Sequence, residues 1–429
     1  MKLKKYLIVF FRLQHLFSTY PLRVRGTRWA HILSACAVLA LVSTPCWAGG
    51  LYITEFGTPS MGVANAGAGA LANDSSIAWH NPAGMTRLSG THAQSTFGLI
   101  YGNVKFDADS DTPVAGGDGG NAAINPAPVL NASFVHSLTD NLKLGFALGS
   151  IAGAGLDYGT NWAGRQQATK VKLLTLTAIP SVAYKMHWLS VGVGLTINYG
   201  NLDTFNLKAP NPAQSTVKAN GDDWAFGFTT GVLVEFSDRS RVAVKYLSKT
   251  EYNFDGDLKI SGGALGGVNV NSTLTIEFPQ TVVVNFYHEF NDQFAVLATA
   301  DWEDWSEFED IPLSTSTGVK AAIPRNWKDT YKLAGGIHYR PSKPWLLMTG
   351  FAYDSSPVDS KDRTADMPMD RQLRYAVGTQ YQWSEQLNLG GSFVYADYGK
   401  AKINNNRTLK GDYKHNDLFF FALNASWIF

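Results

Sequence analysis

Cysteine is almost absent from this chain of 429 residues, and the only two cysteines, Cys36 and Cys46, lie near its start. They fall within a segment that resembles an export signal, with basic residues, a short apolar stretch at 32–42 and the cleavage pattern Cys46-Trp47-Ala48. Cleavage after Ala48 leaves a mature chain without cysteine. Disulfides, cysteine-ligated metals and thiol catalysis are therefore excluded from the mature protein.

The predicted signal peptide spans residues 1–48, which is longer than usual because a second apolar patch lies at 6–11. Two interpretations remain open for residues 1–22. The start codon is assigned too early and translation begins nearer Val24, or the basic region of the signal is unusually long.

Long apolar runs and a strong excess of one charge are also missing. No stretch of the mature chain approaches 18 uninterrupted apolar residues, so no membrane-spanning helix is expected. Residues 1–48 hold seven Lys or Arg and no Asp or Glu, which leaves 29 basic against 35 acidic residues, a formal charge of −6. This balance does not suit binding to nucleic acid.

Strict alternation of apolar and other side chains is abundant, most clearly at the C-terminus. The segment 418–429 ends on Phe429 and carries Trp427 on the same apolar face, opposite Asn424 and Ser426. A strand places successive side chains on opposite faces, so this segment has one lipid-compatible face. A final strand that ends on an aromatic residue is typical of bacterial outer-membrane barrels. We therefore predict that Trp427 and Phe429 form the signal for the barrel-assembly machinery.

The same alternation predicts fourteen strands joined by six short turns and seven long loops, as in an outer-membrane barrel with both termini in the periplasm. The expected fold is an all-β, 14-stranded antiparallel transmembrane barrel over residues 91–429. The strands are expected at 91–106, 128–138, 142–157, 169–186, 188–204, 223–236, 240–254, 270–290, 293–305, 327–340, 345–354, 370–383, 386–398 and 413–429. The long loops are expected at 107–127, 158–168, 205–222, 255–269, 306–326, 355–369 and 399–412.

Residues 49–90 do not share this alternation and are rich in Gly, Ala, Asn and Ser. A barrel of fourteen strands is too wide for the side chains of its wall to fill. We therefore expect residues 49–90 to form an N-terminal hatch that plugs the barrel.

The hatch contains the tripeptide Asn81-Pro82-Ala83, in which the proline favours an extended or turn conformation of the preceding residue. Alone, the tripeptide predicts only a turn. In this context it resembles the hatch motif of the FadL family, outer-membrane transporters of long-chain fatty acids and other hydrophobic compounds. Further segments resemble the family in the same order, over about Gly50 to Phe429: 161–165, 179–184, 301–308, 326–331 and 350–358.

The resemblance implies that a hydrophobic ligand binds between extracellular loops, passes to an apolar pocket and leaves sideways through a kink in the third strand beside the hatch motif. The candidate kink comprises Gly149, Ser150, Gly153 and Gly155. Clustered glycines weaken strand pairing and permit bulges, which supports a kink independently of the family. The alternative is a strand thinned to fit against the plug.

Three cations, Arg165, Arg325 and Lys328, are candidates for binding a ligand carboxylate, although an ordinary solvated loop or lumen cation is the more common case for any single one of them. Several aromatic residues are expected in the interfacial girdles of the barrel instead of a ligand pocket. These residues are Trp302, Trp305, Trp327, Trp345 and Tyr353.

The predicted function is passive uptake of long-chain fatty acids, with aromatic or aliphatic hydrocarbons as the alternative ligands. The mature histidines are scattered and no local Ser–His–Asp signature is visible, so an enzyme is not expected, and the hatch argues against an open porin. We expect no metal or cofactor. The expected partners are the ligand, outer-membrane lipid with lipopolysaccharide, and the assembly machinery, for a monomer in the outer membrane of a Gram-negative-type bacterium.

Overall fold

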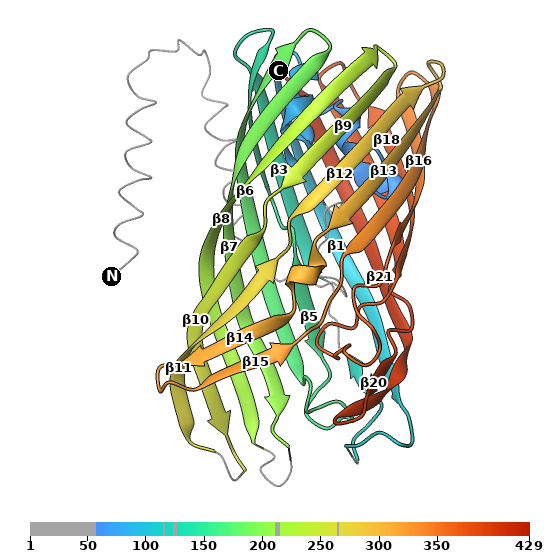
Figure 1. The fold of residues 1–429 in the computed structure, drawn as a ribbon. Coiled ribbons are helices and arrows are strands. Elements are labelled where there is room, and N and C mark those ends of the chain that lie inside the picture. Colours follow the sequence, from blue (N-terminus) through green and yellow to red (C-terminus); the bar gives the residue numbers. More distant parts are fainter. Residues whose placement is uncertain (1–56, 115, 123–126, 211–214, 264–265) are drawn as a thin grey trace. The chain divides into compact units, whose positions relative to one another are not determined.

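The computed structural model describes residues 57–114, 116–122, 127–210, 215–263 and 266–429, so the predicted signal peptide lies outside the described residues. Four short helical turns come first: η2 (Pro59–Val63), α3 (Ala68–Leu71), α4 (Ile77–His80) and η3 (Pro82–Arg87). Among the described residues, no helix is long and apolar enough to cross a membrane. Residues 57–90, here called the hatch segment, pack against inward-facing residues of the strands that follow (Figure 1).

The chain crosses the wall fourteen times in antiparallel order, and each crossing, here called a pass, is one strand or two strands in line. The passes form a closed barrel because the last strand, β21, pairs with the first, β1, beginning at the residue pair His92 and Ile428. The structure confirms the predicted fold class. The passes are β1 (Thr91–Ala108), β3 (Ala127–Ser137), β4 (Leu142–Gly149) with β5 (Gly153–Asp157), β6 (Lys170–Met186), β7 (Leu189–Lys208), β8 (Thr216–Ser237), β9 (Ser240–Leu247) with β10 (Thr250–Ser261), β11 (Val268–Phe278) with β12 (Thr281–Glu289), β13 (Phe294–Glu303), β16 (Thr330–Ser342), β17 (Trp345–Asp354), β18 (Gln372–Gln382), β19 (Leu387–Asp397) and β21 (Leu409–Ile428).

Side chains along the passes alternate between an apolar outer face and a more polar inner face. On β7, Val193 and Leu195 are exposed, whereas Ser190 and Asn198 are fully buried. In a soluble barrel the apolar side chains would point inward, whereas here they point outward, as expected for a barrel surrounded by lipid.

One end of the barrel carries short turns and the C-terminus, and the other carries the long connections (Figure 1). We call these the short-turn end and the long-loop end. The long-loop end also contains β2 (Asn121–Ala122), η4 (Trp305–Glu307), β14 (Asp310–Thr315), β15 (Lys320–Pro324) and β20 (Ile403–Asn405).

Two of the predicted loops, 205–222 and 255–269, are wrong in extent because most of their residues continue the strands. Leu207 pairs with Val217 across β7 and β8, and Leu258 pairs with Val270 across β10 and β11. The sequence predicts these segments as loops because they have polar side chains on both faces. A hairpin that extends beyond the lipid can have polar residues on both faces, since pairing between its strands satisfies the backbone N–H and C=O groups.

Candidate functional site

The hatch motif is a capped turn at the junction of α4 and η3. The backbone N–H of Ala83 donates to Asn81 Oδ1 at 3.0 Å, so Asn81 caps η3 while Pro82 occupies its first turn. Asn81 Nδ2 donates to the carbonyl oxygens of Gly69, in the hatch segment, and Val232, in β8, at 3.3 and 3.2 Å. The asparagine is fully buried, so its side chain joins two hatch turns to the wall.

Two wall glycines allow this close approach. A Cβ on Gly231 of β8 would lie 1.8 Å from Asn81 Oδ1, and a Cβ on Gly192 of β7 would lie 2.4 Å from the Ala83 nitrogen. The motif therefore contacts β7 and β8. The hatch residues next to the third strand are instead Trp79 and Met85, whose side chains lie against Gly149 and Gly145.

The third pass is interrupted between Gly149 and Gly153, which separates β4 from β5. Three residues, 150–152, lie between β4 and β5. On the partner strand β6, only two residues lie between the residue that pairs with Gly149 and the residue that pairs with Gly153. The third pass therefore has one extra residue at this place, which is a bulge. Thr175 of β6 holds it: its hydroxyl donates to the Ala152 carbonyl at 2.6 Å and accepts from the Ala152 N–H at 3.2 Å.

Beyond the bulge, the wall lacks strand pairing on one side within the described residues. Pairing between β3 and β4 ends at Ala132–Leu148, and the described part of the chain gives β5 no strand partner other than β6. Among the residues that the structure describes, 127–131 of β3 consequently pair with β1 alone. We call this place the seam. Asn131, at its edge, is 3% exposed, and its amide has no hydrogen-bond partner among the described residues.

An aromatic cluster fills the barrel interior toward the long-loop end. Trp305 and Trp327 are 2% and 6% exposed, and their rings lie 4.9 Å apart with Phe308 packed against both. The expectation that these two tryptophans belong to outer girdles is wrong, because the η4 turn and the strand pair that follows it fold them inward. Trp345 and Tyr353 are exposed on the outside as expected. The cluster continues through Tyr252, Phe254 and Phe278.

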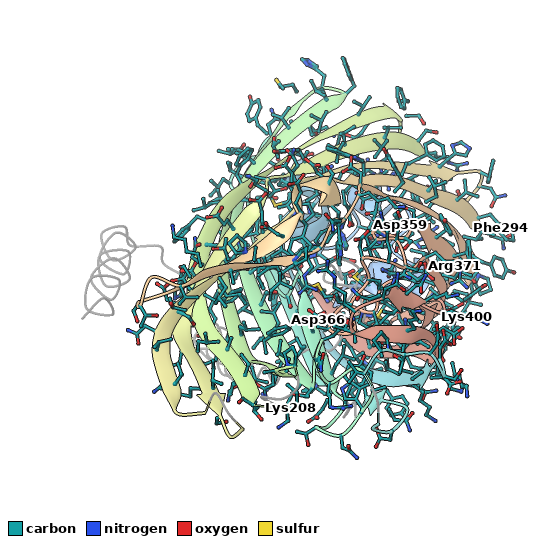
Figure 2. All side chains as sticks on the ribbon, turned by 60° about the horizontal axis from the view of Figure 1, so that its bottom comes forward. Lys208, Phe294, Asp359, Asp366, Arg371 and Lys400 are labelled. Atoms are coloured by element: carbon teal, nitrogen blue, oxygen red, sulfur yellow. The ribbon has the colours of Figure 1, made fainter. Side chains whose placement is uncertain are left out.

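The structure does not bring the three candidate cations together into one exposed carboxylate-binding site. Arg325 is 1% exposed, and its Nη2 lies 2.6 Å from Asp366 Oδ2 in a two-bond ion pair. Lys328 lies 2.7 Å from Asp359 in the exposed loops, and the resulting hydrogen bond lowers the pKa of Asp359. Figure 2, in which the long-loop end comes forward, shows Asp359 and Asp366 there.

Arg165 has a different environment. Its Nη1 donates to the carbonyl oxygens of Gly116 and Trp162 at 2.8 and 2.9 Å, so it joins two loops of the long-loop end. Trp162, fully buried, stacks on Tyr158 with ring centroids 4.1 Å apart. Burial raises the pKa of the Tyr158 hydroxyl, which forms a hydrogen bond of 2.8 Å with the hydroxyl of Tyr413.

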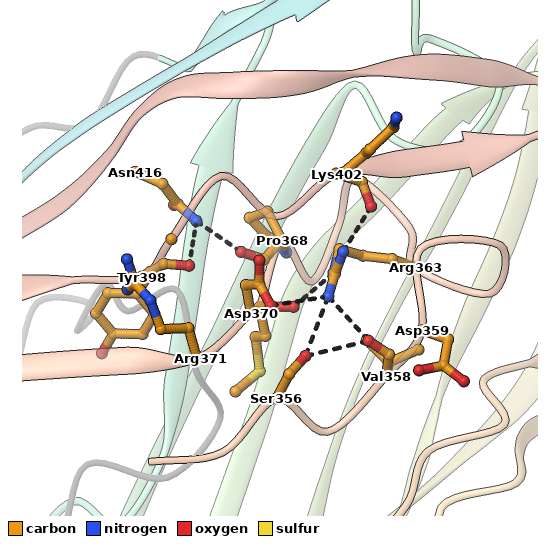
Figure 3. Close-up of polar contacts among 12 residues, drawn as sticks. Ser356, Val358, Asp359, Arg363, Pro368, Asp370, Arg371, Tyr398, Lys402 and Asn416 are labelled. Carbon is orange, nitrogen blue, oxygen red and sulfur yellow. Dashed lines mark hydrogen bonds and ion pairs between the residues drawn. The ribbon is translucent and has the colours of Figure 1, made fainter. Parts of the chain in front are cut away.

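Arg363 organises the loop between β17 and β18 and was not among the candidates (Figure 3). It donates to the carbonyl oxygens of Met369, Lys402 and Val358 at 2.6, 2.5 and 2.8 Å. Burial lowers its pKa from the ordinary arginine value, while the carboxylate of Asp370, 3.3 Å away, opposes that shift. The sequence offered no periodic signal in this loop that could have distinguished Arg363.

The predicted assembly residues lie at the short-turn end. Trp427 pairs with Ala93 of β1 and Leu387 of β19, and Trp427 and Phe429 are both exposed. Their position fits the predicted signal, which stays a prediction.

Comparisons with known proteins agree with this architecture. A family model described as outer membrane protein transport protein (OMPP1/FadL/TodX) matches residues 39–429. A long-chain fatty acid transport protein of Escherichia coli O6:H1 is 28% identical over 408 residues, covering 84% of this chain and 90% of the relative. One from Salmonella typhi is 27% identical over 440 residues, covering 92% and 96%.

Solved structures show the same fold. The crystal structure of a Pseudomonas aeruginosa FadL homologue aligns with a TM-score of 0.79 at 22% identity, covering 89% of this chain and all of that one. The Pseudomonas putida toluene transporter TodX aligns with a TM-score of 0.69 at 14% identity, covering 90% and all.

Together, the closed barrel and these matches define an outer-membrane transport protein and not an enzyme. The chain belongs to the FadL/TodX family, whose members carry fatty acids or other hydrophobic compounds.

Proposed function

We propose that this protein takes up long-chain fatty acids by diffusion, with both termini in the periplasm and the long loops outside. The ligand binds at the long-loop end, enters the aromatic interior and leaves sideways into the bilayer through the seam. The identity to long-chain fatty acid transport proteins over most of the chain supports this ligand class. The bulge at 150–152 occupies the candidate kink predicted from Gly149, Ser150, Gly153 and Gly155.

The observation that carries the proposal is that β3 and β5 are not paired within the part of the chain that the structure describes. The other adjacent passes, as far as the structure describes them, are paired along most of their length. Separating two paired strands in lipid would leave backbone N–H and C=O groups without partners, at several kcal/mol for each group. At the seam, no β3–β5 pairing has to be broken among the described residues, and Thr175 satisfies the backbone N–H and C=O of Ala152 in the bulge.

The driving force is hydrophobic transfer. Each CH₂ that leaves water contributes about 0.8 kcal/mol, so a chain of roughly sixteen carbons favours an apolar interior or the bilayer by about 10 kcal/mol. A lateral route between two apolar environments therefore needs no energy source beyond the concentration gradient.

The test is a reversible closure of the seam. Continuing the register of Ala132–Leu148 sets Val129 opposite Ile151, and both are buried. We would join V129C and I151C with a short bis-methanethiosulfonate in the mature chain, which has no other cysteine. The matched control joins L195C and F228C, a directly paired position on β7 and β8.

Uptake of radiolabelled oleate should fall about tenfold or more in the seam variant, a barrier increase of roughly 1.4 kcal/mol, and recover after reduction. Uptake in the control should not change. Full uptake through a cross-linked seam would contradict lateral exit.

Hydrocarbon is the second candidate ligand, and the pairing of the cations favours it. Arg325 already has a carboxylate partner, so it offers less to a ligand carboxylate than an unpaired cation would. We retain Arg165, Arg325 and Lys328 as the proposed carboxylate-binding residues, and we test Arg325 through its partner Asp366 and Lys328 by direct substitution.

If oleate pairs with Arg325, D366N should tighten oleate binding, because it removes the competing carboxylate. K328M should weaken oleate binding by about 1.5–3 kcal/mol if a charge-assisted bond is lost. Toluene binding should not respond to either change. Equal effects on both ligands, or none on oleate, would favour the hydrocarbon.

A further inference from the structure

Strand β9 presents two cations to the interior, four residues apart on one face of the wall. Arg241 is 4% exposed and Lys245 is partly buried, with the small residue Ala243 between them. No carboxylate lies within ion-pair distance of either cation among the described residues. Both side chains instead reach the backbone of the hatch segment.

Their acceptors are carbonyl oxygens in the last turns of two hatch helices. Arg241 Nε donates to Ala70 O at 2.5 Å and its Nη2 donates to Leu71 O at 2.6 Å, at the end of α3. Lys245 Nζ donates to Trp79 O at 3.0 Å, near the end of α4.

In this geometry the two cations donate hydrogen bonds to helix carbonyl oxygens that have no donor within a short helix. The last carbonyls of a helix have no partner within the helix and carry the negative end of its dipole, so cations are favoured there. Both helices have only four residues and depend on outside contacts for their stability. The Arg241 guanidinium also lies 4.0 Å above the Tyr287 ring, which fixes its fork toward α3.

From these contacts we infer that Arg241 and Lys245 are positioning residues that hold the hatch segment to β9 while ligand moves past its opposite side. The inference rests on the proposed transport function. It adds that the hatch segment stays fixed and that the seam supplies the movement. We call the two residues the β9 clamp.

The chain offers matched hydroxyl pairs on the two sides of the hatch segment. Thr86 Oγ1 lies 2.7 Å from Ser190 Oγ of β7, on the clamp side. Ser75 Oγ lies 2.9 Å from Ser133 Oγ of β3, on the seam side. Each pair can be replaced by two cysteines in a mature chain that otherwise has none.

The first experiment measures hatch accessibility without any ligand. Ala78 of α4 is fully buried, so A78C reports opening of the hatch segment through its rate of labelling by a soluble maleimide. K245M and R241M should accelerate labelling about tenfold, which corresponds to roughly 1.4 kcal/mol of lost hatch stability. K245R, which keeps a cation, should restore most of the protection.

The control is K249M, which removes a cation four residues further along that pairs with Glu277 outside the hatch segment. Heat-modifiable migration on gels verifies that each barrel is folded, and K245M alone is decisive if R241M fails that check. Labelling of K245M at the rate of the parent, or equal acceleration by K249M, would overturn the clamp.

The second experiment separates positioning from contact with ligand. K245M should reduce oleate uptake, and the disulfide of T86C with S190C should restore it, because it ties the hatch segment to the same side of the wall. Reduction should remove the rescue. No rescue by a fully formed disulfide would overturn the positioning role.

The S75C–S133C disulfide, on the seam side, should lower uptake in an otherwise unchanged chain. Unchanged uptake with this disulfide would contradict movement at the seam. If the parent takes up no hydrophobic ligand while the labelling results hold, the proposed function fails and the clamp stands.

Discussion

The two sides of the wall that flank the hatch segment are built differently. On the clamp side, β7, β8 and β9 are paired with one another and bring glycines, an arginine and a lysine against the hatch segment. On the seam side, β5 has one strand partner among the described residues, and a threonine hydroxyl replaces part of the ladder. We propose that the hatch segment has a fixed side and a side where the wall opens, and four substitutions test that contrast.

The largest effect is expected from crowding the clamp side. In G231A the new Cβ would overlap Asn81 Oδ1, so the hatch motif must move, at about 1–3 kcal/mol or more for overpacking. Thermal unfolding of the barrel and labelling of A78C would both report the loss. The control is G335A, where nothing lies within 4 Å of the added methyl group. If the two variants were equally stable, close contact between the motif and β8 would be wrong.

The sequence predicted the barrel well because its signal is repeated fourteen times. Alternation located every pass, and the terminal Trp427 and Phe429 indicated the compartment. Clustered glycines favour weak strand pairing, and Gly149 and Gly153 flank the break between β4 and β5, but a kink that opens the wall there stays a prediction.

The details of the site were harder to predict because they depend on contacts between distant residues. Thr175 and Ala152 meet only across two strands, and Lys245 and Trp79 are 166 residues apart. Arg325 was correctly located near the long loops, but its partner Asp366 lies in a different loop. Likewise, nothing local distinguishes the inward Trp305 from the outward Trp345.

A moderate effect is expected from removing the hydroxyl that holds the bulge. T175V leaves the buried Ala152 N–H and C=O without this partner, at about 1–3 kcal/mol. T177V is the matched control, because Thr177 is on the same strand and donates to Asn198 at 2.7 Å. Both variants should lower stability, but only T175V should raise the oleate uptake rate, since it loosens the seam. Equal uptake in the two would remove Thr175 from the route.

A smaller effect of opposite sign should distinguish two buried asparagines. Asn131 at the seam has no partner among the described residues, whereas Asn198 accepts from Thr177 and donates to Thr196. N131L should match or exceed the parent in thermal stability, because it removes an unsatisfied buried amide. N198L should lose about 1–3 kcal/mol, because two threonine hydroxyls lose their partner. A comparable loss in N131L would show that groups outside the described residues satisfy the Asn131 amide.

The smallest effect concerns Asp74, a hatch residue that is 8% exposed and far from the clamp in sequence. Burial raises the pKa of Asp74, although hydrogen bonding from the Ser76 N–H at 2.8 Å opposes the shift. A raised folded-state pKa means that ionisation costs stability. The packed hatch segment is therefore most stable below the unfolded pKa of about 3.9 and loses stability as pH rises through the folded pKa.

D74N keeps an acceptor for Ser76 but has no charge. The A78C labelling rate of the chain with Asp74, divided at each pH by the rate of the D74N variant, should therefore increase with pH and then level off. A ratio that is constant with pH, or that falls, would show that Asp74 is not desolvated in the packed hatch segment.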